Sequence, residues 1–452
     1  FTINSHNIKS HILSTSAIIV DKIKSDIKNQ LISLKIDCVK RHSRSIMGVN
    51  VQYIKDTELC LYTIGMVEVK EQHSSENLKK LLLEILETYK LNKEQIYTIT
   101  CDNAANMVKL ARIVNDRPEI FVTTTENEQD DNDRDTIDDD ESDVYVNEGE
   151  LLSCTDIENE LENGEEPTNV AITSCVRCSV HTLQLCILQG FKTAPIMNTI
   201  SRARVVDALK PVKIATVALQ KQDLNLGDFF GIWWKASNGL KSNGSILSKS
   251  ILKAMVERQA ILLKNDVFLA AIFLDPRYQC LLDEFEISNG INHLVLTWNA
   301  LLQLSKSEDD LDDEINFNDS YPANSISETE ITDDVNDEDE FELFLSSQSS
   351  VSTIHSDIEN TNNIRSLLND FKNVKREPYA SKIMNYWETQ KLSKPELYKL
   401  ACIVHAVPAT QVSVERSFSG LKFILSDLRT SLSPEQLNAI MIVRSNTKFN
   451  KS

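Results

Sequence analysis

The sequence contains no uninterrupted apolar run that approaches the roughly 18 to 20 residues a membrane-spanning helix needs. Its beginning also lacks a basic segment followed by an apolar core and a small-residue cleavage site, so no secretory signal is predicted. The first residue is Phe1 rather than Met, and we expect the native start, with any signal or further domain, to lie upstream. No feature within these residues predicts a membrane protein.

Cysteine is sparse, because only nine residues, an odd number, are scattered over 452 positions. This distribution is not typical of a disulfide framework, and it favours a reducing compartment, the nucleus or the cytosol. An overall positive charge is missing too, since the formal net charge is −20. Taken alone, that balance argues against a nucleic-acid partner.

The negative charge is concentrated in two stretches. Residues 126–166 hold 19 Asp or Glu and one Arg, and residues 307–342 hold 16 Asp or Glu and neither Lys nor Arg. We expect both stretches to be solvated, disordered inserts. The rest of the chain carries an excess of 14 basic residues, which suits a polyanion such as DNA but is also common in proteins that never contact DNA.

The first hundred residues predict three strands, a helix and a fourth strand. Residues 31–39 alternate between apolar and polar side chains, which is typical of a strand, and residues 46–54 and 59–69 predict two more. Their short links favour antiparallel neighbours. Apolar residues at i, i+3 and i+4 spacing predict a helix at about 74–91. The fourth strand, at 96–101, ends on Asp102, and a helix starts near Ala104.

This order of elements is the opening half of an RNase H-like fold, because the crossover helix is long enough to make the fourth strand parallel to its neighbour. A short strand at 170–173 and a helix at 178–191 are predicted after the first acidic stretch. Residues 200–300 show a helical pattern, further helices are predicted near 363–388 and 394–406, and Ser433-Pro434 marks a helix start. We therefore predict an α/β protein, an RNase H-like catalytic domain interrupted by an α-helical insertion, with acidic disordered loops.

Two acidic residues belong to the predicted strands. Asp37 lies on the polar side of the first strand, where an acid is more often a solvated, outward-facing residue. Asp102 lies at a strand-to-helix junction, where its side chain can simply cap the helix. If the two strands are neighbours in the sheet, the two carboxylates can converge.

A third acid, Glu415, lies in the small, largely uncharged stretch 408–420 at a predicted helix start. A salt bridge, or the favourable position of an acid at a helix N-terminus, can also explain it. Together, three carboxylates from distant segments would suit a pair of divalent cations, which activate a hydroxyl and stabilise the leaving oxygen in phosphodiester chemistry. Spacing alone does not bring the three acids together.

Four stretches of the sequence resemble the hAT superfamily of DNA transposases, in particular proteins described as zinc finger BED domain-containing. They are residues 33–37 with 45–54, residues 98–109, residues 177–185 with 268–278, and residues 408–420 with 427–437 and 443–446. The last stretch is the most specific of the four. The resemblance spans nearly the whole chain except the acidic stretches.

The resemblance implies a metal-dependent catalytic site that holds Mg²⁺ or Mn²⁺ and is formed by Asp37, Asp102 and Glu415. It also implies that Cys178 and His181 lie near this site. Cys175 is a third zinc-compatible side chain close by, but a tetrahedral structural zinc site needs four ligands, so no structural zinc is predicted. A packed cysteine and a hydrogen-bonded histidine remain the simpler interpretation of the pair.

Two departures from the family pattern bear on activity. The BED zinc finger that active members carry upstream is not within the chain. The Arg-Trp segment expected after the Cys-x-x-His pair is missing as well, since residues 201–210 run directly into residues 211–220. Trp233 and Trp234 occur in a different context, and we expect them to be packing residues. These departures leave open whether the chain can transfer DNA strands.

The C-terminal apolar residues have two interpretations. Between Phe418 and Val443 the chain holds more apolar side chains than one small pair of helices can bury alone. They can pack on the protein's own sheet or, as the resemblance implies, some can bury against a second copy of the chain. We expect the contacts of such a homodimer, or of a higher homo-oligomer, at Phe418, Leu421, Leu432, Leu437, Ile440 and Met441.

The predicted division of the chain combines these patterns with the resemblance. The parts are an N-terminal helical segment (1–30), the first part of the RNase H-like domain (31–124), an acidic disordered insert (125–168), the continuation of the domain (169–192), the helical insertion (193–304), a second acidic disordered insert (305–360), and the end of the domain with the dimerisation region (361–452).

The predicted function is that of a nuclear, hAT-type transposase-derived protein that binds and processes DNA through a metal-binding acid triad and dimerises through its C-terminus. If the protein is active, the chemistry is phosphodiester hydrolysis and strand transfer, and the missing Arg-Trp segment favours impaired activity. The alternative is a catalytically inactive remnant, or a host-adopted dimeric protein that binds DNA or other partners. An unrelated nuclease with the same fold is disfavoured by the C-terminal motif.

Overall fold

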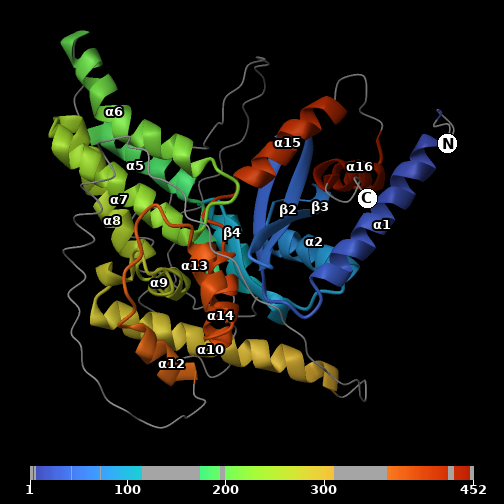
Figure 1. Ribbon diagram of the computed structural model, residues 1–452. Helices are drawn as coiled ribbons and strands as arrows, with labels where there is room; N and C mark the ends of the chain where they lie inside the picture. The colour runs from blue at the N-terminus through green and yellow to red at the C-terminus, as the bar shows by residue number, and fades with distance from the viewer. Residues whose placement is uncertain are drawn as a thin grey trace, which may run out of the picture.

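The fold is described from a computed structural model of the chain (Figure 1). The structure describes residue 4 and the ranges 7–41, 43–71, 73–114, 174–193, 199–309, 364–425 and 432–447. Side chains of 193–204 and 306–309 are outside this description. The first acidic stretch and nearly all of the second lie outside the described residues, as does the strand predicted at 170–173. No helix in the described ranges is long and apolar enough to span a membrane.

A single mixed sheet lies in the half of the molecule that contains both chain ends (Figure 1). Its strands are β1 (Ile32–Arg41), β2 (Arg44–Lys55), β3 (Glu58–Val69), β4 (Ile96–Cys101) and β5 (Ser174–Arg177), in the spatial order β3-β2-β1-β4-β5. The pairs β1–β2 and β2–β3 are antiparallel, whereas β1–β4 and β4–β5 are parallel. The predicted antiparallel hairpins and the parallel fourth strand are therefore confirmed.

One face of the sheet is apolar and packs on helices. On β1, Ile32, Leu34 and Ile36 are no more than 1% exposed, as the alternating pattern predicts. They share a core with the helices α1 (Ile8–Asp26), α2 (Ser75–Thr88) and α3 (Ala105–Ile113). Ser74 caps α2, because its side chain accepts a hydrogen bond from the Asn77 backbone N–H.

The C-terminal helix α16 (Pro434–Ser445) packs on α1 and on the edge strand β3. Two asparagines from this end of the chain bond to the β3 backbone. Asn446 bonds both the N–H and the carbonyl oxygen of Thr63, and Asn438 accepts a 2.8 Å hydrogen bond from the Met66 N–H. These side chains occupy backbone groups that an edge strand would otherwise present to another chain.

The opposite face of the sheet carries polar side chains, yet it is also buried. On β1, Ser33 and Lys35 are each 1% exposed, and on β2, Asn50 and Gln52 are 2% and 0% exposed. The segment 406–413 and helix α15 (Val412–Ile424) lie over this face. An added Cβ at Gly48 would stand 2.7 Å from a methyl carbon of Val414, so the glycine allows α15 to lie directly on β2.

The remaining helices build a second, larger core beside the sheet (Figure 1). They are α5 (Ser179–Thr193), α6 (Thr199–Leu219), α7 (Leu226–Asn243), α8 (Ile246–Leu262), α9 (Asp266–Phe273), α10 (Glu284–Asp309), α12 (Ile364–Phe371), α13 (Ile383–Gln390) and α14 (Pro395–His405). Each residue of α9 from Val267 to Phe273 is at most 4% exposed, so this helix is the centre of the core. Trp233 is 2% exposed against Phe229, which confirms its predicted packing role, and Trp234 packs at the edge of the same core.

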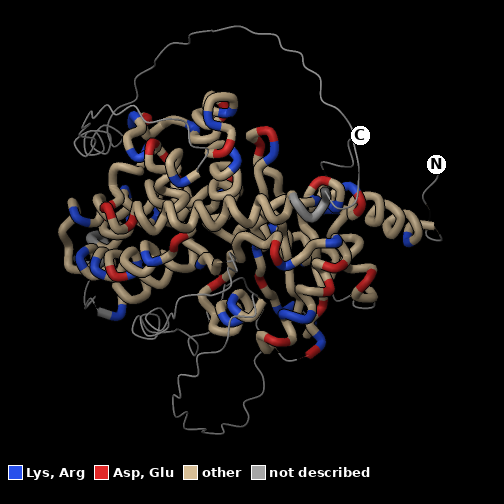
Figure 2. The backbone as a smooth tube through the Cα atoms, turned by 90° about the horizontal axis from the view of Figure 1, so that it is seen from below, with Lys and Arg blue, Asp and Glu red and all other residues tan. Residues whose placement is uncertain are grey.

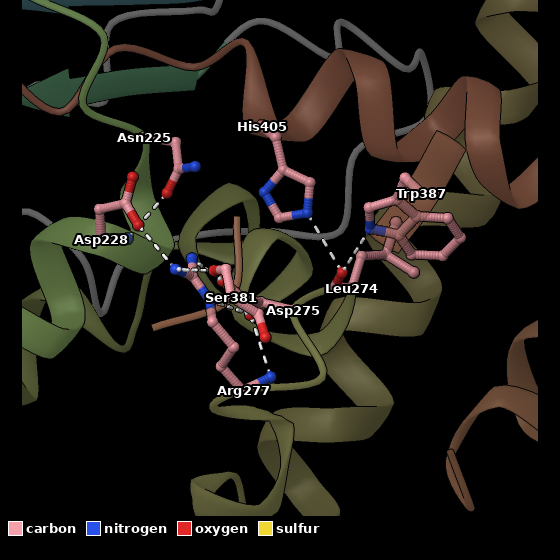
Figure 3. Close-up of polar contacts among 8 residues, drawn as sticks. All are labelled: Asn225, Asp228, Leu274, Asp275, Arg277, Ser381, Trp387 and His405. Atoms are coloured by element: carbon pink, nitrogen blue, oxygen red, sulfur yellow. Dashed lines mark hydrogen bonds and ion pairs between the residues drawn. The ribbon is translucent and has the colours of Figure 1, made fainter. Parts of the chain in front are cut away.

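A buried ion-pair network follows α9 (Figure 3). The Arg277 guanidinium donates to both carboxylate oxygens of Asp275, at 2.9 and 2.7 Å, and Asp275 is 0% exposed. The same guanidinium lies 2.9 Å from Asp228 on α7 and donates to the carbonyl oxygen of Ser381. A Cβ at Gly227 would collide with the Asp275 carboxylate, so only glycine fits there. The network joins α7 and the turn after α9 to the segment before α13.

A single backbone carbonyl extends this junction to α13 and α14 (Figure 3). The oxygen of Leu274 accepts a 3.0 Å hydrogen bond from the Trp387 indole and lies 3.1 Å from Nε2 of His405. Burial lowers the pKa of His405, so the imidazole is neutral and Nε2 carries the donating proton. Helices α13 and α14 are therefore part of the larger core.

Charged residues of both signs are interspersed along the described backbone, as Figure 2 shows. The two acidic stretches carry net charges of −18 and −16, and the rest of the chain carries +14. The described part of the chain thus offers cationic side chains on many of its helices.

Candidate active site

The candidate site begins with Asp37 on the central strand β1. Its carboxylate shares the buried polar face with Ser33 and Lys35, so it is not the outward-facing, solvated residue typical of an exposed strand. Asp37 is half-buried, and its Oδ1 accepts a 2.9 Å hydrogen bond from the Cys38 backbone N–H. The segment 406–413 and helix α15 lie over this face and shield Asp37 from bulk water.

Asp102 follows directly after β4, the parallel neighbour of β1. Its Oδ1 accepts a 3.2 Å hydrogen bond from the Ala104 N–H, just before α3 begins. The N-cap residue of α3 is Ala104, which makes no side-chain capping hydrogen bond, so Asp102 holds the turn before the helix rather than capping it. Because β1 and β4 run in parallel, Asp37 and Asp102 approach one another towards the carboxyl side of the sheet.

Cys178 lies between β5 and α5, and His181 lies in the first turn of α5. The Cys178 N–H donates a 2.8 Å hydrogen bond to the Cys101 carbonyl oxygen, which places the start of α5 beside the end of β4. Cys178 is 0% exposed, whereas His181 is partly buried in the first turn of α5. Cys178 thus lies next to the strand end that precedes Asp102, and His181 interacts electrostatically with Cys178, Glu415 and Asp37.

Glu415 reaches the site because segment 406–413 is bound to the polar face of the sheet. Four hydrogen bonds hold it there: Gln52 to the Ala406 carbonyl (2.7 Å), Thr100 to the Pro408 carbonyl (2.9 Å), the Ser179 N–H to the Ala409 carbonyl (2.9 Å), and Asn50 to the Ser413 hydroxyl (3.1 Å). Helix α15 starts at the end of this segment, with Glu415 in its first turn. The polar face of the sheet therefore positions the third acid.

The electrostatics of Asp37 show that the three carboxylates interact. Burial and the nearby charges of Asp102 and Glu415 raise the pKa of Asp37 from 3.8 to about 8. A carboxyl group with two acidic neighbours and little water resists ionisation. The site thus has an excess of negative charge, which a bound cation would relieve.

His181 supplies part of the opposite charge. Burial alone would lower the pKa of the imidazole, but Cys178 and the carboxylates of Glu415 and Asp37 outweigh burial and raise this pKa to about 9. The ring is then protonated near neutral pH. His181 is therefore an electrostatic partner of the acids as well as a packed residue.

Lys35 is a charged residue of the site that sequence reasoning did not single out. It lies on the same face of β1 as Asp37, is 1% exposed, and interacts electrostatically with Cys178. Burial lowers the pKa of its ammonium group to about 7. No sequence pattern indicates this environment, because a lysine on the polar side of a strand usually faces water.

The donor chemistry of the site fits a hard divalent cation. Three carboxylates provide oxygen ligands, and Oε1 of Glu415 is buried without a hydrogen-bond partner among the described residues. As placed, however, no three His, Cys, Asp or Glu side chains of the described ranges form a group that could hold a metal ion. Binding an ion would therefore require these side chains to rotate towards one another.

The residues expected at a dimer contact fall into two groups. Leu421, Leu437 and Met441 are 0% exposed, in a core that also contains Ile46 and Met66 of the sheet. These three side chains pack on the protein's own sheet, which is one of the two interpretations of the apolar C-terminal residues. The other three expected residues, which pack only partly against this core, are Phe418, Leu432 and Ile440.

Comparison with known families gives two matches. Residues 363–447 match the hAT family C-terminal dimerisation region, and residues 2–110 match a family described as ZMYM1/FAM200, RNase-like domain. A comparison with curated protein sequences gives no match. Asp37 and Asp102 lie in the second of these regions and Glu415 in the first, so the site joins the two matched regions.

Proposed function

Because the chain is an hAT-family transposase-like protein with a C-terminal dimerisation region, we propose that its three carboxylates bind divalent metal ions and act on the phosphodiester backbone of DNA. The observation that carries the proposal is the raised pKa of Asp37, caused by burial and by the charges of Asp102 and Glu415. Acids from three distant segments share one partly buried volume. Such clustering costs folding stability, and strongly perturbed acids of this kind are concentrated at functional sites.

Each residue has a distinct part in the proposed chemistry. Asp37, Asp102 and Glu415 would hold Mg²⁺ or Mn²⁺, which supplies an activated hydroxyl and stabilises the leaving oxygen. Binding would require Asp37 to lose its proton, so metal affinity rises with pH. His181 carries a positive charge beside Asp37 and Glu415, and it limits the repulsion among the acids before binding.

The remaining parts of the proposal concern assembly, the division of the chain and the location of the protein in the cell. The dimerisation region supports homo-oligomerisation, and we assign the contact to the partly exposed C-terminal side chains rather than to the buried ones. Helices α6 to α10 would be the insertion into the RNase H-like domain, and the acidic stretches its solvated loops. A protein that acts on chromosomal DNA would work in the nucleus.

A second candidate function is a non-enzymatic dimer that binds DNA or protein partners. It is favoured by the side-chain placement, because no three potential ligands in the described ranges form a group that could hold a metal ion. The missing Arg-Trp segment in the sequence favours it too. In this case the acids would be remnants of an earlier site.

Cleavage of labelled duplex DNA by the purified chain separates the two candidates. We expect nicking that requires Mn²⁺ or Mg²⁺ and falls roughly a hundredfold or more in Asp102→Asn, which removes one metal-binding charge. Asp207→Asn is the matched control, since Asp207 is an exposed acid on α6. If the folded, dimeric chain does not nick DNA, the non-enzymatic function is supported instead; equal nicking by both variants would overturn the assignment of Asp102 as a metal-binding residue.

A further inference from the structure

A surface groove lies between α1, α2 and α16, beside the edge strand β3. It encloses about 460 Å³, which is within the roughly 300–1,000 Å³ that is usual for binding clefts. Val20, Val67 and Leu81 line it and are only partly buried, although they pack against the apolar core of the sheet. The apolar core therefore reaches the surface in this groove.

The rim of the groove is acidic. Its charged residues are Asp21, Glu84 and Glu435, one from each of the three helices, and no Lys or Arg of the described ranges lines it. All three acids are exposed, and Lys24, which lies 3.6 Å from Asp21, offsets part of their charge. An apolar floor with an acidic rim fits an occupant whose apolar side chains are flanked by cations.

Helix α6 carries such a face on its surface. The five exposed residues of this face are Val206, Lys210, Lys213, Ile214 and Val217. At 3.6 residues per turn they lie within about a third of the helix circumference, and Asp207 lies at the edge of the face. Val206, Ile214 and Val217 are 69%, 58% and 62% exposed. The spacing of these apolar residues is typical of a helix that docks in a groove.

The position of α6 favours a contact between two chains. Figure 1 shows α6 on the far side of the molecule from α1 and α16, so α6 does not reach the groove of its own chain. We propose that α6 of one copy of the chain docks in the groove of a second copy. Val206, Ile214 and Val217 then contact the apolar floor, and Lys210 and Lys213 face the acidic rim.

This contact differs from the one assigned to the partly exposed C-terminal side chains. It joins two different surfaces, so it can link one C-terminal dimer to the next. One helix face is a small interface beside the roughly 1,200 Å² or more that stable complexes bury. Each contact is therefore weak, and we expect assemblies larger than a dimer to form as the protein concentration rises.

Reversal of the charges on each surface tests the inference in the full chain. The α6 variant combines Lys210→Glu with Lys213→Glu, and the groove variant combines Asp21→Lys with Glu84→Lys. All four side chains are exposed, so both variants should melt like the parent. We expect each variant to raise the dissociation constant of the larger assemblies by roughly tenfold or more, because like charges then face one another. Sedimentation velocity at several protein concentrations measures this change.

An equal mixture of the two variants is the decisive sample. In the mixture, the new glutamates on α6 of one chain meet the new lysines in the groove of the other. The unchanged lysines and the unchanged acids meet in the same way. We therefore expect the mixture to recover the larger assemblies that each variant alone has lost.

The matched controls carry the same charge changes on other exposed surfaces. Lys249→Glu with Lys253→Glu changes two lysines of α8, and Glu284→Lys with Asp370→Lys changes two acids of α10 and α12. Both controls should assemble like the parent.

The inference is overturned if the parent forms no species larger than a dimer. It is also overturned if only one of the two surfaces matters, or if the mixture does not recover the larger assemblies. None of these measurements involves DNA or a metal ion, so the proposed function is tested separately.

Discussion

The Thr100 hydroxyl donates a 2.9 Å hydrogen bond to the carbonyl oxygen of Pro408, although 308 positions separate the two residues. Thr100 lies on β4, two positions before Asp102, and Pro408 begins the stretch that leads to Glu415. One buried contact therefore links the positions of two acids of the candidate site. Both partners are shielded from water, so the bond is costly to break.

Thr100→Val should lower both stability and site function. Valine keeps the shape of threonine but leaves the Pro408 carbonyl without its donor, at a cost of about 1–3 kcal/mol. We expect a lower urea midpoint and reduced metal-dependent nicking by the folded protein. Thr88→Val is the control, because its hydroxyl bonds only within the exposed surface of α2. Equal midpoints for the two variants would show that the Thr100 bond does not matter.

Asp37→Asn should stabilise the metal-free protein in a pH-dependent manner. Folding raises the pKa of Asp37 from 3.8 to about 8, so the unfolded chain releases this proton at a lower pH than the folded chain. The parent therefore loses stability as pH rises through that window, and the asparagine variant does not. The difference in unfolding free energy should be small near pH 4 and reach the order of 5 kcal/mol by pH 8.

Urea unfolding in the presence of a chelator, at several pH values, measures this difference. Asp207→Asn should follow the parent at every pH, since Asp207 is exposed. Parallel curves for the parent and Asp37→Asn would contradict the burial of Asp37 among other acids.

Arg277→Met should be strongly destabilising, by about 3–5 kcal/mol. The substitution leaves the carboxylate of Asp275 buried and without its bidentate partner. The double variant Asp275→Leu with Arg277→Met should recover part of the loss, because it removes the unpaired charge as well. Unfolding free energies of the parent, both single variants and the double variant give the coupling directly. If the changes in unfolding free energy of the two single variants add up to that of the double variant, Asp275 and Arg277 do not stabilise the fold as a pair.

Phe423→Ser should weaken self-association without unfolding the chain. The Phe423 ring is 70% exposed on α15 and lies under the Arg444 guanidinium, which is the pairing of large aromatic and Arg side chains enriched at protein interfaces. We expect the dimer dissociation constant to rise by roughly tenfold or more in analytical ultracentrifugation. Phe285→Ser, which changes an equally exposed ring on α10, should leave association unchanged. A drop in melting temperature comparable to that of Leu421→Ser would indicate a folding defect instead.

Local patterns predicted the sheet well. The strands, their antiparallel hairpins and the parallel fourth strand follow from alternation and from the length of the crossover, and all of these are present. The helix predicted at 394–406 corresponds to α14, whereas the helical stretch near 363–388 is interrupted between Phe371 and Ile383. The strand predicted at 170–173 lies outside the described residues, and the described strand β5 begins at Ser174. The domain boundaries remain predictions.

The environment of the site was harder to predict, because it depends on contacts between distant segments. Nothing near Lys35 in the sequence indicates that residues 406–413 cover its face of the sheet. The same limitation applies to Gln411, whose buried and unpartnered amide is visible only in three dimensions. For the dimer surface, periodicity identified apolar residues but did not separate those in the protein's own core from those left partly exposed.

The covering of the polar sheet face has a consequence for how the protein is made. Strands β1 to β4 are all synthesised before the segment that satisfies Asn50, Gln52 and Thr100, and 308 positions separate Thr100 from its partner Pro408. Until that segment is synthesised, the polar side chains of this sheet face lack their hydrogen-bond partners. The face is then open to contacts with other proteins. Folding of this sheet is therefore completed only after residue 413 has been synthesised, and a premature stop before residue 406 would leave that sheet face permanently uncovered.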